Sequence, residues 1–390
     1  MRIAIVAEDY PPNHGGIADY ISGIAHALDS QGHNVEVVAA RVTGDEKYDE
    51  TSPVRVTRIG ERDIRRNPLG IVGRFRSVLQ FEKELQHWFS STYSKVRPDF
   101  AIVGSVSSWA KVCSANNIPY FVGVHGGDAF GKRADLLRTH YRKHTVRKVF
   151  CRARCVGANS RFTQEKIVDF GVSVEKTLIT YCGVADEFLG EIANIGIDPT
   201  PEHIDGNLLM LCRLVKFKAV DVVIKAIARL VPRYPSLNLK IAGDGPESEP
   251  LKNLVKELGI TQNIEFLGYI GSVGEKAELL KACDAYVMSG RFDPVTARQE
   301  TFGIVFAECG ASSRPGIGPR IGGVPEVISH GETGLLVEPD NVDSLASAIE
   351  TLLTETGLAS RMGDAGRIRV AEYFNYQKIA ELIVERMSTQ

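Results

Sequence analysis

Glu300 and Glu308 bracket the stretch ETFGIVFAE, which is otherwise apolar and typical of a protein core. Charged side chains are rarely buried unless they are paired, so the position of these two carboxylates needs a chemical explanation. A helix that begins at Phe302 or Gly303 would present free backbone amides, and the positive end of its dipole, to an anion such as phosphate. Glu300 would then precede the helix, and Glu308 would lie up to ~12 Å away at 1.5 Å per residue.

This arrangement fits a long ligand with hydroxyl groups at both ends and phosphate between them. Carboxylates accept strong hydrogen bonds from paired hydroxyls, and a nucleotide sugar offers a ribose, a diphosphate and a hexose in that order. The candidate phosphate contacts are the residues around the helix start, namely Phe302, Gly303, Ile304 and Val305. The alternative is structural: Glu300 only neighbours the helix N-cap, and Glu308 lies on the exposed face of an amphipathic helix.

Two cations and two glycine-rich turns add to this hypothesis. Arg213 and Lys218 follow the apolar run LLMLC, where a strand end would place them at a ligand, and both can neutralise a diphosphate. Glycine turns after strands let backbone amides approach phosphate closely. The glycines concerned are Gly15, Gly16, Gly243 and Gly245. Solvated cations and ordinary turns remain the alternatives, and the missing GxGxxG spacing argues against an NAD enzyme.

Short apolar runs alternate with amphipathic segments and would position these residues. Strands are predicted at RIAIVAE, NVEVVAA, FAIVGS, YFVGVHG and RCVGANS, with helices over 16–31, 70–92 and 132–150. The alternation restarts after residue 207 with strands at NLLMLCRL, LNLKIAGDG, IEFLGYI, AYVMS and PGIGPRIGG. Helices are predicted there near 219–232, 248–258, 274–282, 303–312, 324–329 and 341–354. This pattern predicts an α/β protein with mostly parallel sheets.

The same pattern predicts two doubly wound, Rossmann-like domains, over residues 1–185 and 208–371. Residues 186–207 lose periodicity and gather Gly, Pro and Asp, which is typical of a linker. Folds of this kind bind ligands at the carboxyl ends of their strands, so we expect the site in a cleft that the two domains face.

Composition narrows the function classes. The 390 residues are 44% hydrophobic and 24% charged, with a net charge of -2, which is ordinary for a globular protein and offers no reason to expect nucleic acid. The seven cysteines are scattered without a paired CxxC or a Cys/His array, which favours a reduced compartment and no metal site. The N-terminal apolar run is short, and no run reaches the ~18 apolar residues of a membrane span, so we expect a cytoplasmic protein.

Taken in order, the motifs resemble a known family. HGGIADY, VHGGD, ANSRFT, RLVKFKAVD, AGDGPE, FLGYI, ETFGIVFAE and GGVPEVISHGETGLLVEP occur in this sequence as they do in retaining glycosyltransferases of family 4 (GT4). The resemblance runs almost from end to end. It implies the two-domain GT-B fold, whose final helix, here about residues 372–390, crosses back to the first domain.

The resemblance also implies roles for individual residues. It implies an NDP-sugar donor held mainly by the second domain, with Arg213 and Lys218 at the diphosphate, Glu300 at the hexose and Glu308 at the ribose. It places His125 near the transferred sugar, and the first glycine turn and Asp128 among the residues that contact substrate. The catalytic candidates are therefore His125, Arg213, Lys218 and Glu300. From the residues alone, His125 is also explained as a structural histidine bonded to backbone.

The implied reaction is hexosyl transfer from an NDP-sugar, with UDP favoured and GDP as the alternative, to a hydroxyl of a glycan, a glycolipid or a small molecule. The family keeps the anomeric configuration and generally needs no divalent metal. Two other functions stay open: another sugar-nucleotide enzyme of this fold, such as an epimerase or phosphorylase, and a noncatalytic binding protein.

Departures from the family pattern limit these inferences. Cys212 stands where Gly usually precedes the arginine, Ala219 where Gly commonly follows the lysine, and Gly316 where a β-branched residue is more usual, which predicts a weaker strand. The segment GRFDPVTARQE is longer than average, so the identity of the sugar is not inferred.

The N-terminal half has two segments rich in Arg and Lys, within 62–80 and 131–154. In the second segment Leu137, Tyr141 and Val149 can form a buried stripe, while the cations Lys132, Arg138, Arg142, Lys143, Arg147 and Lys148 point outward. Such a helix could bind an anionic membrane surface or attract a phosphorylated acceptor. The alternative is a solvated basic face.

Overall fold

The computed structural model describes residues 1–12, 15–61, 70–93, 96–106, 109–127, 129–130, 136–196 and 202–389, with side chains throughout except at 61, 70–79 and 136–142. The chain forms two compact units. The first unit contains Met1–Tyr181 together with Tyr376–Gln390, and the second contains Cys182–Asn375.

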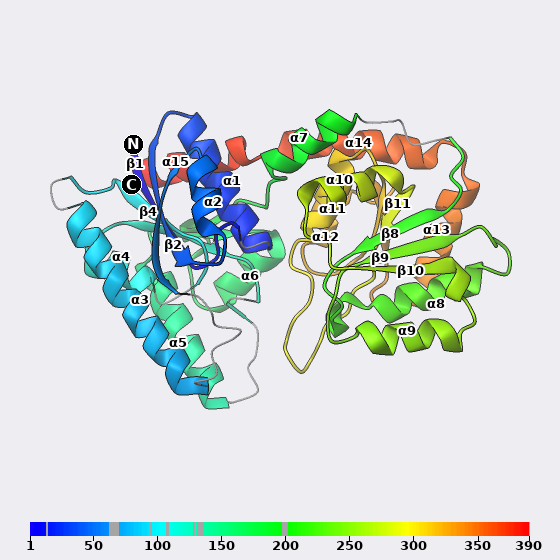
Figure 1. Cartoon of the computed structure of the whole chain (residues 1–390), viewed down its shortest axis with the longest axis horizontal. Helices are drawn as coiled ribbons and strands as arrows, with labels where there is room; N and C mark the ends of the chain where they lie inside the picture. Colours follow the sequence, from blue (N-terminus) through cyan, green and yellow to red (C-terminus); the bar gives the residue numbers. More distant parts are fainter. Residues whose placement is uncertain are drawn as a thin grey trace. The chain divides into compact units, whose positions relative to one another are not determined.

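The first unit is built on a parallel sheet of seven strands in the order β3-β2-β1-β4-β5-β6-β7 (Figure 1). Its strands are β1 (Arg2–Ala7), β2 (Asn34–Arg41), β3 (Arg55–Glu61), β4 (Phe100–Val103), β5 (Tyr120–Val124), β6 (Cys155–Ala158) and β7 (Thr177–Ile179). All four residues of β4 and all five of β5 are buried. Continuous burial explains why these strands are apolar without alternation, because helices cover both faces of a parallel sheet.

Helices connect these strands and close the unit. They are α1 (Gly16–Ser30), α2 (Asp45–Thr51), α3 (Gly70–Thr92), α4 (Ala110–Ala115), α5 (Leu136–Arg152), α6 (Arg161–Asp169) and the C-terminal α15 (Tyr376–Ser388). Helix α15 packs on α1, where a Cβ on Gly23 would lie 2.3 Å from the ring of Tyr376. Glycine at position 23 therefore permits this contact, and the predicted return of the final helix to the first domain is confirmed.

The second unit has a parallel sheet of six strands in the order β10-β9-β8-β11-β12-β13. The strands are β8 (Asn207–Leu211), β9 (Asn238–Ala242), β10 (Ile264–Gly268), β11 (Ala285–Val287), β12 (Gly316–Pro319) and β13 (Gly334–Val337). The helices are α7 (Asp186–Ile195), α8 (Val220–Leu230), α9 (Ser248–Glu257), α10 (Val273–Ala282), α11 (Ile304–Ala311), α12 (Val324–Val327), α13 (Val342–Thr354) and α14 (Leu358–Tyr373). In Figure 1, α8 and α9 lie on one side of β8–β10, and α10 and α11 lie on the other. The predicted pair of doubly wound α/β sheets is confirmed.

Two predictions about local structure differ from the fold. The segment 186–207, predicted as a linker, contains helix α7, whose Phe188 and Ile192 are buried against the second unit. Strand β12 forms between two neighbours although it begins at Gly316, which was predicted to weaken it. A Cβ at Gly316 would lie 2.9 Å from the ring of Phe306, so the glycine makes room for that side chain.

Candidate functional site

In the second unit, the candidate residues gather at the point where the strand order reverses. Strands β8 and β11 are neighbours, but the strands that follow each of them lie on opposite sides. The loops that leave the carboxyl ends of β8 and β11 therefore diverge and leave a crevice, which is where doubly wound sheets bind ligands. Lys218 comes from the first of these loops and Glu300 from the second.

Lys218 and Glu300 form an ion pair in which the lysine Nζ donates to Glu300 Oε2. The side chains are only 18% and 13% exposed, so water screens the pair weakly. Glu300 Oε1 also accepts from the amides of Thr301, at 3.2 Å, and Phe302, at 3.4 Å. The carboxylate is thus held on both oxygens just before α11.

Burial and charge act in opposite directions on the pKa of each partner. Burial alone would raise the pKa of Glu300, but the Lys218 ammonium and the two backbone amides hold that pKa below its usual value. Burial alone would lower the pKa of Lys218, but the charge of Glu300 more than offsets this, and the lysine pKa is raised. Both groups are therefore charged at neutral pH.

Helix α11 begins at Ile304, one or two residues later than predicted. Gly303 is its N-cap with φ 87°, a conformation that favours glycine. Phe302 is 2% exposed and packs edge-on against Phe374 at 5.5 Å, so its ring belongs to the core. The amide of Phe302 is already bonded to Glu300, so of the predicted phosphate contacts the amides of 303–305 are the groups suited to an anion, because the first amides of a helix lack intrahelical partners.

Glu308 is buried inside α11, with 5% of its surface exposed. Its Oε1 accepts from Nζ of Lys276 on α10, and the ammonium also lies 5.0 Å from the ring centre of Phe188. The alternative in which Glu308 lies on an exposed helix face is therefore wrong. Lys276 was not predicted from the sequence, because it becomes a partner of Glu308 only when α10 and α11 both pack on α7.

Arg213 differs from the two lysines in being exposed. Among the residues that the structure describes, no hydrogen bond or ion pair engages its guanidinium. The pKa of Lys218 is raised overall because Glu300 outweighs burial, and the charge of Arg213 opposes that rise as the smallest contribution. Cys212, which replaces the usual glycine, is buried, and burial raises the pKa of its thiol to about 11.

The glycines of GDGP are explained by backbone packing. A Cβ at Gly243 would lie 1.9 Å from the carbonyl oxygen of Cys212, and one at Gly245 would lie 2.3 Å from that of Leu214. The turn therefore packs directly against the segment that carries Arg213. Close packing accounts for both glycines, and contact between them and a ligand stays a prediction.

The loop that carries Glu300 is anchored by a residue that sequence reasoning missed. Arg291 donates from Nη2 to both oxygens of Asp221, at 2.7 and 2.9 Å, and from Nε to Asp340 at 3.0 Å. Burial alone would raise the pKa of Asp221, but the hydrogen bonds and the charge of Arg291 outweigh burial, and the pKa is lowered overall. The spacing of the three residues in sequence gives no signal of this contact.

In the first unit, His125 follows β5 close to the point where strand order reverses between β1 and β4. Its Nε2 lies 3.0 Å from the carbonyl oxygen of Gly104, and its ring meets Tyr20 edge-on at 4.7 Å. Tyr20 in turn bonds Thr180 Oγ1 at 3.1 Å. The contact with Gly104 agrees with a structural histidine, and a role for His125 at the transferred sugar stays a prediction.

Gly15 and Gly16 stand at the start of α1. Gly15 has φ 154° and ψ 154°, and no atom lies within 4 Å of a Cβ built on either glycine. Their backbone therefore borders open space that a ligand could enter. Asp128, the remaining candidate, lies outside the described residues, as do Lys132 and the side chains of Leu137, Arg138, Tyr141 and Arg142.

Membrane-spanning helices and metal-binding groups are both absent from the residues that the structure describes. Within those ranges, no helix is both long and apolar enough to cross a membrane. The described His, Cys, Asp and Glu side chains also form no group of three that could hold a metal ion. The expectation of metal-free chemistry stays a prediction.

Comparisons with known proteins agree with the geometry. The model described as "Glycosyltransferase Family 4" matches residues 14–188, and "Glycosyl transferases group 1" matches residues 202–369. The chain is 27% identical over 402 residues to the GDP-mannose-dependent alpha-(1-6)-phosphatidylinositol monomannoside mannosyltransferase of Mycolicibacterium smegmatis, covering 98% of each protein. It is 36% identical over 172 residues to the N-acetyl-alpha-D-glucosaminyl L-malate synthase of Bacillus anthracis, covering 44% of this chain and 42% of the synthase. The solved structure of Anabaena HepE in complex with UDP has the same fold, with a TM-score of 0.74, 18% identity and complete coverage of both chains.

Proposed function

The chain belongs to glycosyltransferase family 4 and has the GT-B fold, and we propose that it transfers a hexosyl group from an NDP-sugar to an acceptor hydroxyl with retention of anomeric configuration. One observation carries the proposal. The pair formed by Lys218 and Glu300 is charged and partly buried, and it lies where the strand order reverses, next to the free amides of α11. Buried charges are costly, and a ligand that needs both charges explains why they lie at this position.

In the proposed complex, the diphosphate lies against the amides that begin α11. Arg213, whose guanidinium is exposed, and Lys218 meet the charge that develops on the departing nucleoside diphosphate. Electrostatic stabilisation by groups already in position is usually the largest contribution to such a rate. Glu300 accepts from hexose hydroxyls, and Glu308 accepts from the ribose through the oxygen that Lys276 does not occupy.

The acceptor hydroxyl approaches the anomeric carbon from the face that the diphosphate leaves. The C–O bond to the acceptor forms as the bond to the diphosphate breaks, and the acceptor proton passes to a phosphate oxygen of the leaving group. His125, fixed by Gly104 and Tyr20, borders the sugar in this proposal. Protein cations, and not a divalent metal, neutralise the leaving group.

Two donors have priority for testing because of what related proteins use or bind. The mycobacterial relative is described as GDP-mannose-dependent, and Anabaena HepE was solved with UDP and with UDP-glucose. We therefore propose GDP-mannose or a UDP-hexose as the donor, and a glycan, glycolipid or small molecule as the acceptor.

Thermal unfolding in the presence of UDP-, GDP-, ADP- and dTDP-sugars tests donor binding, because a ligand that binds the folded state raises its Tm. The donor that binds is then incubated with candidate acceptors, and the anomeric configuration of the product is measured by NMR, with and without EDTA. We expect an α-linked product from an α-linked donor, at a rate that EDTA does not change. Donor isomerised or phosphorolysed without an acceptor, or an inverted product, would contradict the proposal.

A further inference from the structure

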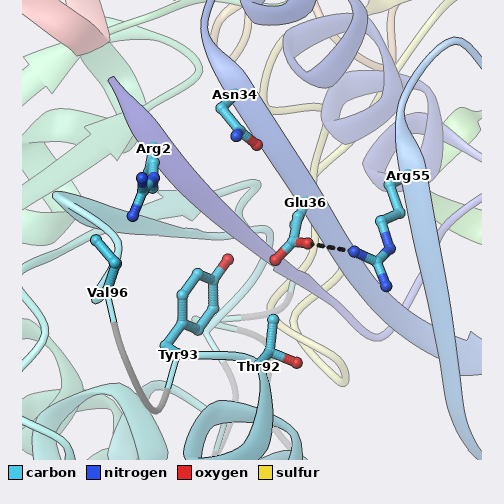
Figure 2. Close-up of a pocket in the computed structure, with 7 residues that line it drawn as sticks. All are labelled: Arg2, Asn34, Glu36, Arg55, Thr92, Tyr93 and Val96. Atoms are coloured by element: carbon cyan, nitrogen blue, oxygen red, sulfur yellow. Dashed lines mark hydrogen bonds and ion pairs between the residues drawn. The ribbon is translucent and has the colours of Figure 1, made fainter.

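A polar pocket lies at the amino-terminal edge of the first sheet (Figure 2). It has a volume of about 430 Å³. In the register of the sheet, Arg2 on β1 lies opposite Asn34 on β2, and Glu36 on β2 lies opposite Arg55 on β3. The residues that line the pocket are Arg2, Asn34, Glu36, Arg55, Thr92, Tyr93 and Val96.

This pocket is separate from the candidate catalytic residues of the first unit. His125 follows the carboxyl end of β5, and Gly15 belongs to the loop after the carboxyl end of β1. The pocket lies at the opposite, amino-terminal ends of the strands, and a six-residue strand such as β1 is about 20 Å long. The proposed transfer reaction therefore does not use this pocket.

The acidic groups at the pocket are already engaged by the protein. Glu36 Oε1 accepts from Nη1 of Arg55 at 3.1 Å. Figure 2 shows the Tyr93 hydroxyl directed toward Glu36. Burial, followed by the nearby charge of Glu36, raises the pKa of Tyr93, so the phenol stays protonated. Asp99, which adjoins the edge, accepts from the backbone amide of Arg2 at 2.8 Å.

Several hydrogen-bond donors at the pocket remain unengaged. Within the described ranges, the side chains of Arg2, Asn34 and Thr92 make no hydrogen bond or ion pair. Arg55 is 76% exposed and bonds Glu36 through one nitrogen, so its other N–H groups face solvent. Among the lining residues, two guanidinium groups face one carboxylate, an excess of one positive charge, while Asp99 beside the pocket already accepts from the amide of Arg2. A ligand that complements this lining must therefore supply negatively charged acceptors.

We propose that this pocket is a second, noncatalytic site for a small metabolite that carries an oxyanion, of the size of a sugar phosphate. Guanidinium groups donate two parallel hydrogen bonds to phosphate or carboxylate, and such bonds are about twice as strong as neutral ones. The volume falls within the ~300–1,000 Å³ of small-molecule sites and exceeds what a single inorganic ion fills. Glu36 holds Arg55 in position before the ligand binds.

The test uses the full chain with its affinity tag cleaved off, because both ends of the chain lie near Arg2: Ser388 Oγ is 3.6 Å from Met1 Sδ. Isothermal titration calorimetry at low salt measures binding of glucose 6-phosphate, inorganic phosphate and acetate, each with and without UDP. We expect glucose 6-phosphate to bind with a stoichiometry of one, and UDP to leave its affinity unchanged. Acetate that binds equally well would support the oxyanion site and assign it to carboxylates.

Three variants locate the binding. Arg2→Gln removes an exposed guanidinium, and Asn34→Asp adds a carboxylate of nearly the same shape, so we expect each to weaken glucose 6-phosphate binding about tenfold or more. Arg41→Gln, an equal charge change on an exposed residue at the other end of β2, should change affinity less than about twofold. Binding equal to wild type in both pocket variants, no binding of any probe at about 10 mM, or competition by UDP would overturn the proposal. Each outcome can be read whether or not the chain transfers sugar.

Discussion

At the scale of residues, Glu300 and Glu308 are alike in chemistry but differ in surroundings. If they bind opposite ends of the donor, Glu300→Gln should lower kcat more than nucleotide affinity. Glu308→Gln should instead weaken UDP or GDP by roughly 1.5–3 kcal/mol, the range of a hydrogen bond to a charged group. Calorimetry and steady-state kinetics measure the two effects, and Glu265→Gln, on an exposed glutamate of β10, is the matched control. Equal small changes in both assays would refute the division of roles.

Arg213 and Lys218, the cations near the point where the strand order reverses in the second unit, should respond differently when each is changed to alanine. Arg213 is exposed and has no partner in the described part of the chain, so Arg213→Ala should lower turnover about tenfold or more while Tm stays constant. Lys218→Ala should lower turnover and also cost roughly 3 kcal/mol of stability, because Glu300 loses its buried counter-charge. Kinetics and urea unfolding of both variants provide the comparison. A large loss of stability in Arg213→Ala would contradict the solvent-exposed position of Arg213.

The ion pair between Lys218 and Glu300 should also give stability a specific pH dependence. The lowered pKa of Glu300 gives a contribution that is present above its unfolded value of about 4.3 and is lost as pH falls through the folded value. The raised pKa of Lys218 gives a contribution that is present below about 10.4 and is lost as pH rises through the folded value. The difference in unfolding free energy between wild type and Glu300→Gln should therefore be constant from about pH 6 to 9 and shrink below about pH 4. Urea unfolding across this range measures it, and an undiminished difference in acid would contradict the assignment.

At the scale of elements, the residue that caps the start of α8, Ala219, has a strained backbone. Ala219 is buried and adopts φ 50° and ψ 43°, where an L side chain costs about 1–2 kcal/mol. Ala219→Gly removes that strain but increases the entropy of the unfolded chain, so we expect a net gain of about 0.5–1 kcal/mol. Ala226→Gly, inside the same helix, should lose about 1 kcal/mol and serves as the control. Equal destabilisation of both variants by urea would argue against strain at Ala219.

The elements also show what the sequence could and could not predict. Central strands such as β4 and β5 are continuously apolar and were predicted, whereas β3, β7 and β13 were missed, and all three lie at sheet edges. An edge strand such as RVTRIGE is less apolar, so its pattern is weaker. Helix α7 was missed because its local sequence is rich in small and acidic residues, and burial of Phe188 and Ile192 stabilises it. Tertiary packing decides such cases, and a single sequence does not show it.

The candidate site also depends partly on tertiary packing that a single sequence does not show. Lys218 and Glu300 were each named as site candidates, because a strand end and a helix start are local patterns, but their ion pair was not predicted. The pairing of Glu308 with Lys276 and the anchoring of Arg291 depend on contacts between helices and loops distant in sequence. The glycines of GDGP were assigned to ligand approach, but backbone packing against Cys212 and Leu214 already requires them.

At the scale of the whole molecule, the charge is unevenly distributed although the net charge is only -2. On the described part of α5, Lys143, Arg147 and Lys148 are exposed and Val149 is buried, as predicted, and Val146 and Phe150, which were not predicted, are buried beside it. An exposed basic face could attract an acceptor at an anionic membrane surface. Each cation near such a surface contributes about 1 kcal/mol.

We therefore expect the chain to sediment with vesicles that contain anionic lipid at low salt, and to be released at high salt, because screening shortens the reach of exposed charges to about 8 Å at physiological ionic strength. Changing Lys143, Arg147 and Lys148 together to Glu should reduce binding more than tenfold. The matched control changes three exposed lysines of the second unit, Lys240, Lys252 and Lys256, to Glu and should bind as wild type. Sedimentation that persists in high salt would indicate apolar attachment and not charge. No binding at low salt would leave α5 as a solvated basic face and would favour a soluble acceptor.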